Sequence, residues 1–128
     1  MRKIDHFALI SHSEVESDRF YTDLLGFKRK YDFKVNSKLL NKIFGINKEI
    51  KVIRYGGNNC DLEIFIIKDL KVIENSLSHI GIIVENKEKI LNRAEVMGYR
   101  VNKIPKKDSD SYYLFIKDDS GNYFEIKE

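Results

Sequence analysis

The stretch Ile4-Asp5-His6-Phe7-Ala8-Leu9-Ile10 has a counterpart later in the chain, Leu77-Ser78-His79-Ile80-Gly81-Ile82-Ile83. Each stretch carries a histidine early in a run of apolar residues. Each is followed, at nearly the same spacing, by a glycine and an aromatic residue, Gly26-Phe27 and Gly98-Tyr99. Because a pattern that recurs along a chain is the signature of a repeated structural unit, we predict one module that is used twice.

The segment between each histidine and its glycine has the features of a helix. In the first copy, Ser13 and Glu16 form an S-x-x-E capping box, and in the second copy Asn86 is a candidate N-cap. Gly26 and Gly98 suit the left-handed position that commonly follows a helix. We therefore expect each helix to end at its glycine.

Runs with strand character follow each helix and are separated by turns rich in glycine, asparagine and aspartate. The runs are 27–34, 49–55, 60–67, 99–104, 112–117 and 123–127. Segment 39–45 is extra in the first copy, and we expect a short helix or lid there. The predicted fold class is α+β, a single domain over 1–128 built of two β-α-β-β-β modules. The first module is 1–67, the second is 77–128, and 68–76 is the connection.

The composition is that of an ordinary globular domain, with 42% hydrophobic and 34% charged residues in a chain of 128. The net charge is +3 and the two signs are interleaved, which argues against a nucleic-acid surface. One cysteine, Cys60, excludes an intrachain disulfide and favours the reducing cytoplasm; we expect Cys60 to be a small buried hydrophobe. No signal-peptide pattern or membrane-length apolar run is visible, so no membrane association is expected.

Strand alternation points to a candidate metal site. Side chains two apart share one face of a strand, so His6 and His79 should lie opposite the strongly apolar faces of their strands. The last strands of the two copies place Glu63 and Glu125 in the same way. Each module thus offers one histidine and one glutamate, and the pairing of like residues in both copies favours ligands over ordinary surface residues.

Two imidazoles and two carboxylates suit a divalent metal such as Zn, Ni, Co, Mn or Fe(II). Four protein ligands with two waters would complete an octahedron and leave room for oxygen atoms of a substrate. The predicted metal ligands are therefore His6, Glu63, His79 and Glu125. The two modules can pair within one chain or across a dimer, and the same four residues are used in either case.

Two motifs resemble the vicinal oxygen chelate superfamily, which includes glyoxalase I, the bleomycin and fosfomycin resistance proteins and extradiol dioxygenases. Residues 17–27, SDRFYTDLLGF, look like the first-helix motif of that family. Residues 118–126, DDSGNYFEI, look like its D-P-x-G-N-x-x-E-L ending, with Asp119 in place of proline. The resemblance covers nearly the whole chain. It implies an eight-stranded, barrel-like sheet with helices outside, and a homodimer.

The resemblance also implies a glyoxalase I-like function. The four predicted ligands fall where glyoxalase I carries its own, and the implied activity is that of a metal-dependent lyase or isomerase acting on a small α-oxygenated substrate. Glu125 and Glu63 are the candidate catalytic residues, because a ligand glutamate that leaves the metal can transfer a proton. Ile10 and Ile67 replace the arginine and asparagine that help bacterial glyoxalases hold glutathione, which argues against a glutathione adduct.

Two alternatives remain open. A non-catalytic drug-binding protein of the bleomycin resistance type is favoured by aromatic residues that could line an apolar cleft, although packing in the core is the simpler explanation for most of them. These residues are Phe33, Phe44, Phe65, Tyr112 and Tyr113. A fosfomycin-modifying transferase is a minor alternative, since relatives with that activity use two histidines and one glutamate.

Overall fold

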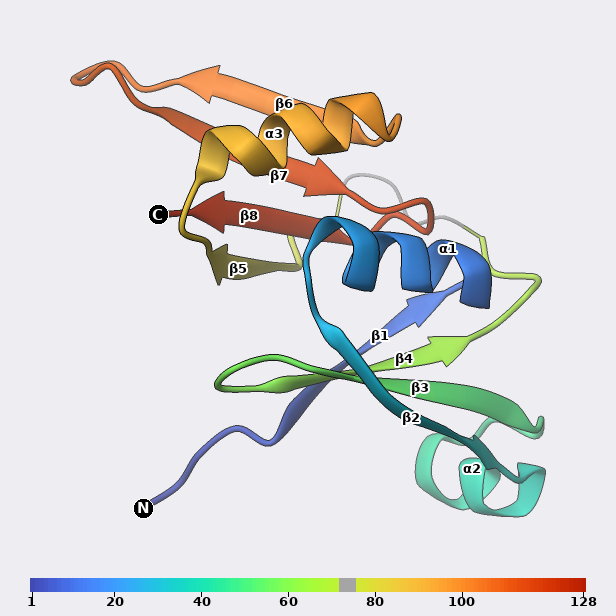
Figure 1. Ribbon diagram of the computed structural model, residues 1–128. Helices are drawn as coiled ribbons and strands as arrows, with labels where there is room; N and C mark the ends of the chain where they lie inside the picture. Colours follow the sequence, from blue (N-terminus) through green and yellow to red (C-terminus); the bar gives the residue numbers. More distant parts are fainter. Residues whose placement is uncertain (72–75) are drawn as a thin grey trace. The chain divides into compact units, whose positions relative to one another are not determined.

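Two four-stranded sheets, one for each copy of the repeat, form the framework of the computed structural model (Figure 1). The structure describes residues 1–71 and 76–128, so residues 72–75 of the predicted connection lie outside the described part. Contacts divide the chain into two compact units, Met1–Leu70 and Lys71–Glu128. Each unit has the element order β-α-β-β-β, with one further helix between the second and third strands of the first unit, and this confirms the predicted fold class.

The first unit has the strand order β1-β4-β3-β2. Its strands are β1 (His6–Ser11), β2 (Lys28–Val35), β3 (Ile50–Gly56) and β4 (Asp61–Ile66). Its helices are α1 (Glu14–Asp18), the π-helix η1 (Arg19–Leu24) and α2 (Ser37–Phe44). β1 is parallel to β4, whereas β3 is antiparallel to both β4 and β2. The first and last strands of the module are therefore neighbours.

The first helix begins and ends where the sequence predicts, but its second half widens. The Ser13 side chain accepts a hydrogen bond from the Glu16 amide at 3.3 Å, and Gly26 ends the helix at a φ of 78°. Between them the chain forms a π-helix, which the sequence did not predict. The wider turn rotates the chain less per residue, so the adjacent Phe20 and Tyr21 can both be buried.

The second unit repeats the arrangement with the strand order β5-β8-β7-β6. Its elements are β5 (His79–Ile83), α3 (Lys87–Val96), β6 (Arg100–Pro105), β7 (Tyr112–Lys117) and β8 (Tyr123–Lys127). β5 is parallel to β8, which is antiparallel to β7. Figure 1 shows α3 lying along one face of this sheet, where it contacts β6 and β7.

Both ends of α3 are confirmed, but its buried face is not the predicted one. Asn86 accepts a hydrogen bond from the Lys89 amide at 3.0 Å, and Gly98 has a φ of 84°. The apolar spacing predicts a face of Ile90, Ala94 and Met97. The buried apolar residues are instead Leu91 and Ala94, while Ile90 and Met97 stay partly exposed. The buried face of α3 is therefore rotated about the helix axis by about one residue relative to the predicted face.

The core lies on the helix-covered side of each sheet. Leu62, Ile64, Phe124 and Ile126 are buried there, as alternation predicts. Phe7 is on the same side of its strand but remains 44% exposed, because β1 is an edge strand of its sheet. Within the described residues, no helix combines the length and apolar character needed to cross a membrane.

A network centred on one aspartate shapes the turn before β8. The buried Asp118 accepts hydrogen bonds from the amides of Ser120 and Asn122 at 3.0 and 2.8 Å, and from the Asn122 side chain at 2.8 Å. Gly121 adopts a φ of 95° in the same turn. These contacts fix the start of β8 and therefore the position of Glu125 within it.

Candidate metal centre

The first unit brings His6 and Glu63 together, as strand alternation predicts. The parallel register pairs His6 with Asp61 and Ala8 with Glu63, so both predicted ligands point from the same face of the β1–β4 pair. The His6 Nε2 atom lies 3.2 Å from Glu63 Oε1. The two side chains are 37% and 14% exposed, so the donor atoms are partly shielded and still reach solvent.

The second unit places its predicted ligands in the same way, with a looser contact. Gly81 pairs with Glu125 in the parallel register, so His79 and Glu125 share a face. The His79 Nε2 atom is 3.8 Å from Glu125 Oε2, and the Nδ1 atom is 2.8 Å from the Leu77 carbonyl oxygen. The Phe115 ring meets the imidazole edge to face, with 5.5 Å between centroids.

The donor atoms of each pair suit a divalent metal, and each unit supplies two of them. An imidazole nitrogen and a carboxylate oxygen that face each other are a common pair of ligands for Zn, Mn or Fe. Within residues 1–71 and 76–128, no three histidine, cysteine, aspartate or glutamate side chains gather closely enough to hold a metal ion. Each unit therefore supplies one imidazole and one carboxylate as candidate metal donors.

Charged residues surround the first pair. Asp5 Oδ2 is 2.9 Å from His6 Nδ1, and the Arg54 guanidinium on β3 is 3.2 Å from Glu63 Oε2. Hydrogen bonds from His6 and from Arg54 lower the pKa of the Asp5 carboxyl to about 2. The carboxylate is thus ionised at neutral pH. An ionised Asp5 that accepts the Nδ1 proton leaves the lone pair of a neutral imidazole on Nε2, the atom that faces Glu63.

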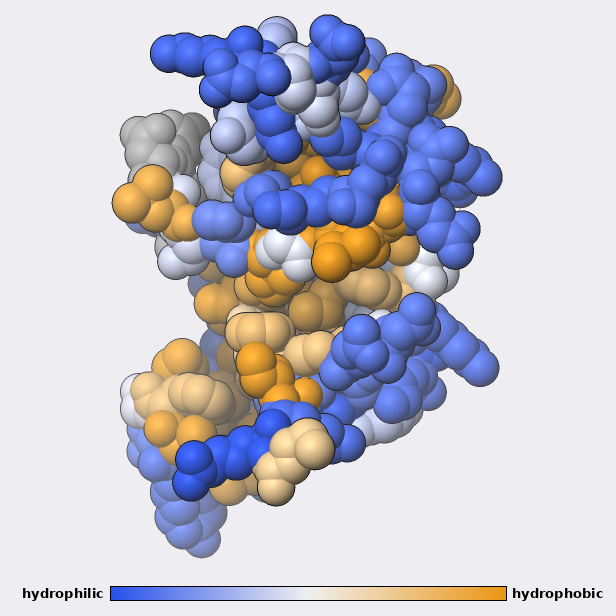
Figure 2. Space-filling model, turned by 90° about the vertical axis from the view of Figure 1, so that its left-hand side faces the viewer, coloured by the Kyte–Doolittle hydropathy of each residue, from blue (hydrophilic) through white to orange (hydrophobic). Residues whose placement is uncertain are grey.

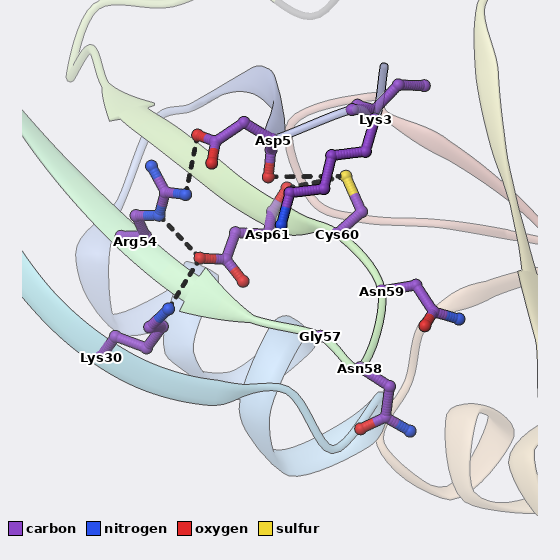
Figure 3. Close-up of a pocket in the computed structure, with 10 residues that line it drawn as sticks. Lys3, Asp5, Lys30, Arg54, Gly57, Asn58, Asn59, Cys60 and Asp61 are labelled. Carbon is purple, nitrogen blue, oxygen red and sulfur yellow. Dashed lines mark hydrogen bonds and ion pairs between the residues drawn. The ribbon is translucent and has the colours of Figure 1, made fainter. Parts of the chain in front are cut away.

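A polar cavity of about 330 Å³ lies beside these residues (Figure 3). Its walls include Lys3, Lys30, Arg54 and Asp61. Cys60 also lines it, which contradicts the prediction that this residue is a small buried hydrophobe. Its thiol is partly exposed and lies 3.5 Å from the Asp61 carbonyl oxygen, because Cys60 belongs to the turn before β4 and not to the strand itself.

The five aromatic residues that could line a cleft are not in the core, contrary to the simpler explanation. Phe33, Phe44 and Tyr113 are 37%, 58% and 49% exposed, and Phe65 and Tyr112 are partly exposed. Figure 2 shows hydrophobic residues at the surface among largely hydrophilic ones. The sheet register places Phe33 and Phe65 on the face that carries Glu63, and the Phe44 ring of α2 contacts Phe65 edge to face at 6.0 Å.

Ile10 and Ile67 stand where the resemblance to bacterial glyoxalases predicts an arginine and an asparagine. They lie on β1 and just after β4, the two strands that carry His6 and Glu63. Ile10 is on the same face of β1 as His6 and is 42% exposed. Ile67 follows β4, and its amide donates to the Ser11 carbonyl oxygen at 2.8 Å. An exposed aliphatic side chain at position 10 cannot form an ion pair with a carboxylate of a ligand.

Sequence reasoning missed Asp5 and Arg54, the two charged residues that contact the first pair. A signal was present for each. Asp5 immediately precedes the first histidine, and Arg54 lies between the apolar Ile53 and Tyr55. Neither signal says which carboxylate or imidazole the residue contacts, because that depends on the register between strands.

Comparison with known proteins bears on the family and the fold of the chain. Residues 3–126 match the family described as the Glyoxalase/Bleomycin resistance protein/Dioxygenase superfamily. No curated protein matches the chain. Among solved structures, the chain is similar to a glyoxalase family protein from Enterococcus faecalis, with a TM-score of 0.74 and 19% identity over 99% of this chain and 98% of the other.

Two further solved structures are similar. One is the trypanothione-dependent glyoxalase I of Leishmania major, with a TM-score of 0.72 and 17% identity, covering 100% of this chain and 87% of the other. The other is a variant of the fosfomycin resistance protein FosX from Listeria monocytogenes in complex with Mn(II) and a dihydroxypropylphosphonic acid. Its TM-score is 0.74 with 15% identity, covering 99% of this chain and 92% of the other. At these identities the likeness concerns the fold alone.

Proposed function

Because the chain belongs to the Glyoxalase/Bleomycin resistance protein/Dioxygenase superfamily, we propose that it is a metal-dependent lyase or isomerase acting on a small α-oxygenated substrate. The observation that carries the proposal is the pairing of His6 with Glu63 and of His79 with Glu125. These four side chains would be the ligands of one divalent metal. The two pairs would meet either within one chain or between the two copies of a homodimer.

A metal held by these residues would supply Lewis-acid polarisation of two neighbouring oxygen atoms of the substrate. Metal binding and proton transfer would be the work of the side chains. The imidazoles of His6 and His79 would hold the metal. The carboxylate of Glu125 or Glu63 would accept a proton from the carbon beside the polarised oxygen and return it to the neighbouring carbon, as general base and then general acid.

The substrate is proposed to be a small molecule that is not a glutathione adduct. Ile10 and Ile67 provide an aliphatic surface where a charged and an amide side chain would otherwise hold a peptide-like carrier. We further propose that the protein works in the cytoplasm, since its cysteine content requires no oxidising compartment.

Metal binding tests the proposal directly. The protein is purified without chelators, its metal content is measured by mass spectrometry, and the apoprotein is titrated with Zn, Ni and Mn in a calorimeter. We expect one ion per chain, and loss of measurable binding in His6→Ala and in Glu125→Gln. His12→Ala is the matched control, because His12 belongs to neither pair. Absence of bound metal together with no heat of binding would exclude the proposed function.

The exposed aromatic residues favour a second candidate, a protein that binds a drug or another apolar small molecule without chemistry. Phe33, Phe44 and Phe65 lie on or beside the face that carries Glu63. Tight ligand binding that is unchanged in Glu125→Gln would favour this candidate over the enzyme. An epoxide-opening assay with fosfomycin tests the minor alternative, a fosfomycin-modifying transferase, in the same preparation.

A further inference from the structure

Arg54 contacts three carboxylates of the first unit, two on β4 and one just before β1. Its Nε atom donates to Asp61 at 2.7 Å, one terminal nitrogen is 2.9 Å from Asp5, and the other is 3.2 Å from Glu63. The Arg54 side chain is only 14% exposed. Arg54 and Glu63 are direct partners in the antiparallel register of β3 and β4, so the backbone itself holds them side by side.

We propose that Arg54 and Asp5 are positioning residues that orient the His6–Glu63 pair for metal binding. The inference rests on the proposed function, since it concerns two of the four proposed ligands. Asp5 would hold the imidazole through Nδ1, and Arg54 would hold the carboxylate through Oε2. The remaining atoms, His6 Nε2 and Glu63 Oε1, are the two that face each other at 3.2 Å.

The contacts close into a ring of four side chains. His6 meets Asp5 at 2.9 Å, Asp5 meets Arg54 at 2.9 Å, Arg54 meets Glu63 at 3.2 Å, and Glu63 meets His6 at 3.2 Å. Each member therefore has two neighbours within the ring. Hydrogen bonds to the outer atoms of metal ligands fix ring orientation and tautomer, and their loss typically weakens metal affinity about 10- to 100-fold.

Asp61 anchors the ring to the sheet. It accepts from Arg54 Nε at 2.7 Å and from Lys30 on β2 at 2.9 Å, and only 12% of its side chain is exposed (Figure 3). The guanidinium is thus fixed from one side by Asp61 and can hold Asp5 and Glu63 with its two terminal nitrogens.

The second unit has no arginine at the corresponding position of its sheet, and the cation that contacts Glu125 is Lys127 of the same strand, at 3.4 Å. Phe115 is the partner of Glu125 in the register of β7 and β8, at the place where Arg54 is the partner of Glu63. The His79 Nδ1 atom faces a backbone carbonyl oxygen instead of a carboxylate. The two copies of the repeat therefore carry the same histidine–glutamate pair, but different groups contact the outer atoms of each pair. His79 can serve as an internal reference in experiments on His6.

Nitrogen NMR of the metal-free protein tests the proposal without any activity assay. In wild type we expect neutral His6 to carry its proton on Nδ1. In Asp5→Ala and in Arg54→Gln, the His6 ring should shift toward the Nε2–H tautomer, while the signals of His79 stay unchanged. Arg54→Lys, which keeps a cation, should retain part of the wild-type signature. An unchanged His6 tautomer in both Asp5→Ala and Arg54→Gln would overturn the proposal.

Metal titration of the same variants provides the second readout. Arg54→Gln should bind Co(II) about 10- to 100-fold more weakly than wild type and should alter its visible spectrum, which reports ligand geometry. Lys51→Gln is the matched control, because it removes a cation from the opposite face of β3, where Lys51 contacts Glu14. Unchanged Co(II) affinity and spectrum in Arg54→Gln would overturn the proposal that Arg54 positions the His6–Glu63 pair. If wild type itself binds no metal, the proposed function fails, and the His6 tautomer alone decides the positioning roles.

Discussion

Tyr55 on β3 is completely buried, yet its hydroxyl group has two partners. It donates to Asp18 Oδ1 at 2.6 Å and lies 3.0 Å from the Ser17 hydroxyl oxygen. Burial, followed by the hydrogen bond to Asp18, raises the pKa of Tyr55 well above its usual value of 10. The phenol therefore stays protonated and joins the first helix to the sheet at any ordinary pH.

Tyr55→Phe should destabilise the protein by about 1 to 2 kcal/mol, because the ring is retained while a buried hydrogen bond to a carboxylate is lost. Urea unfolding followed by circular dichroism measures the change. Tyr31→Phe is the control, since Tyr31 is 51% exposed and its hydroxyl group can bond to water. A Tyr55→Phe protein as stable as wild type would show that the hydroxyl contacts make no net contribution to the free energy of unfolding.

For single residues, strand alternation correctly predicted the side of each strand on which a side chain lies, because side-chain direction follows from position along the strand. This holds for His6, Glu63, His79 and Glu125. That these four bind one metal stays a prediction. Arg54 could not be assigned a partner from the sequence. Its position opposite Glu63 depends on the register of β3 against β4, which neither strand determines by its own sequence.

The first helix is held to the sheet by an ion-pair network as well as by its apolar face. Arg29 on β2 contacts Glu14 and Asp18 of α1, each at 2.7 Å, and Lys51 on β3 contacts Glu14 at 3.0 Å. The hydrogen bond from Arg29, and then that from Lys51, lower the pKa of the Glu14 carboxyl below its usual value of 4.5.

Arg29→Gln should lower stability at neutral pH by at most about 1 kcal/mol, since all members of the network keep contact with water. The pKa of Glu14 is lowered in the folded state, so its contribution is present above pH 4.5 and is lost as the pH falls below that value. The difference between wild type and variant should therefore shrink in acid. Urea unfolding at a series of pH values measures it. A difference that stays constant into acid would contradict the role of Glu14.

For the helices, the capping residues were easier to predict than the buried faces. Ser13, Asn86, Gly26 and Gly98 occupy the predicted ends of their helices, because capping chemistry is local. The π-helix η1 and the burial of Leu91 were not predicted. Both depend on how the helix packs against its sheet, and no spacing of apolar residues within the helix alone determines that.

At the scale of the whole molecule, mixing two defective variants can decide where the proposed site forms. Neither His6→Ala nor His79→Ala alone should bind metal. If the two pairs meet across a homodimer, a mixed dimer of the variants contains one site with both histidines and one site with neither. Half of the dimers are mixed after free subunit exchange of equal amounts, and each mixed dimer has one complete site of two. Metal binding measured by calorimetry should therefore return to about a quarter of its wild-type value.

The control for this experiment is a mixture of His6→Ala with Glu63→Gln, which lie in the same unit and cannot complement each other in this way. Recovery in the first mixture but not in the second would assign the site to the dimer. If neither mixture recovers binding although native mass spectrometry, with one variant isotope-labelled, shows that mixed dimers form, the pairs meet within one chain.

The parallel pairing of the first and last strands in each unit has an evolutionary consequence. Since β1 lies beside β4 and β5 beside β8, a gene that encoded a single module would already bring one histidine and one glutamate together. Duplication and fusion of such a gene would double the number of donor atoms without the invention of a new ligand. The two copies would then be free to diverge, one gaining an arginine and the other a phenylalanine beside its glutamate.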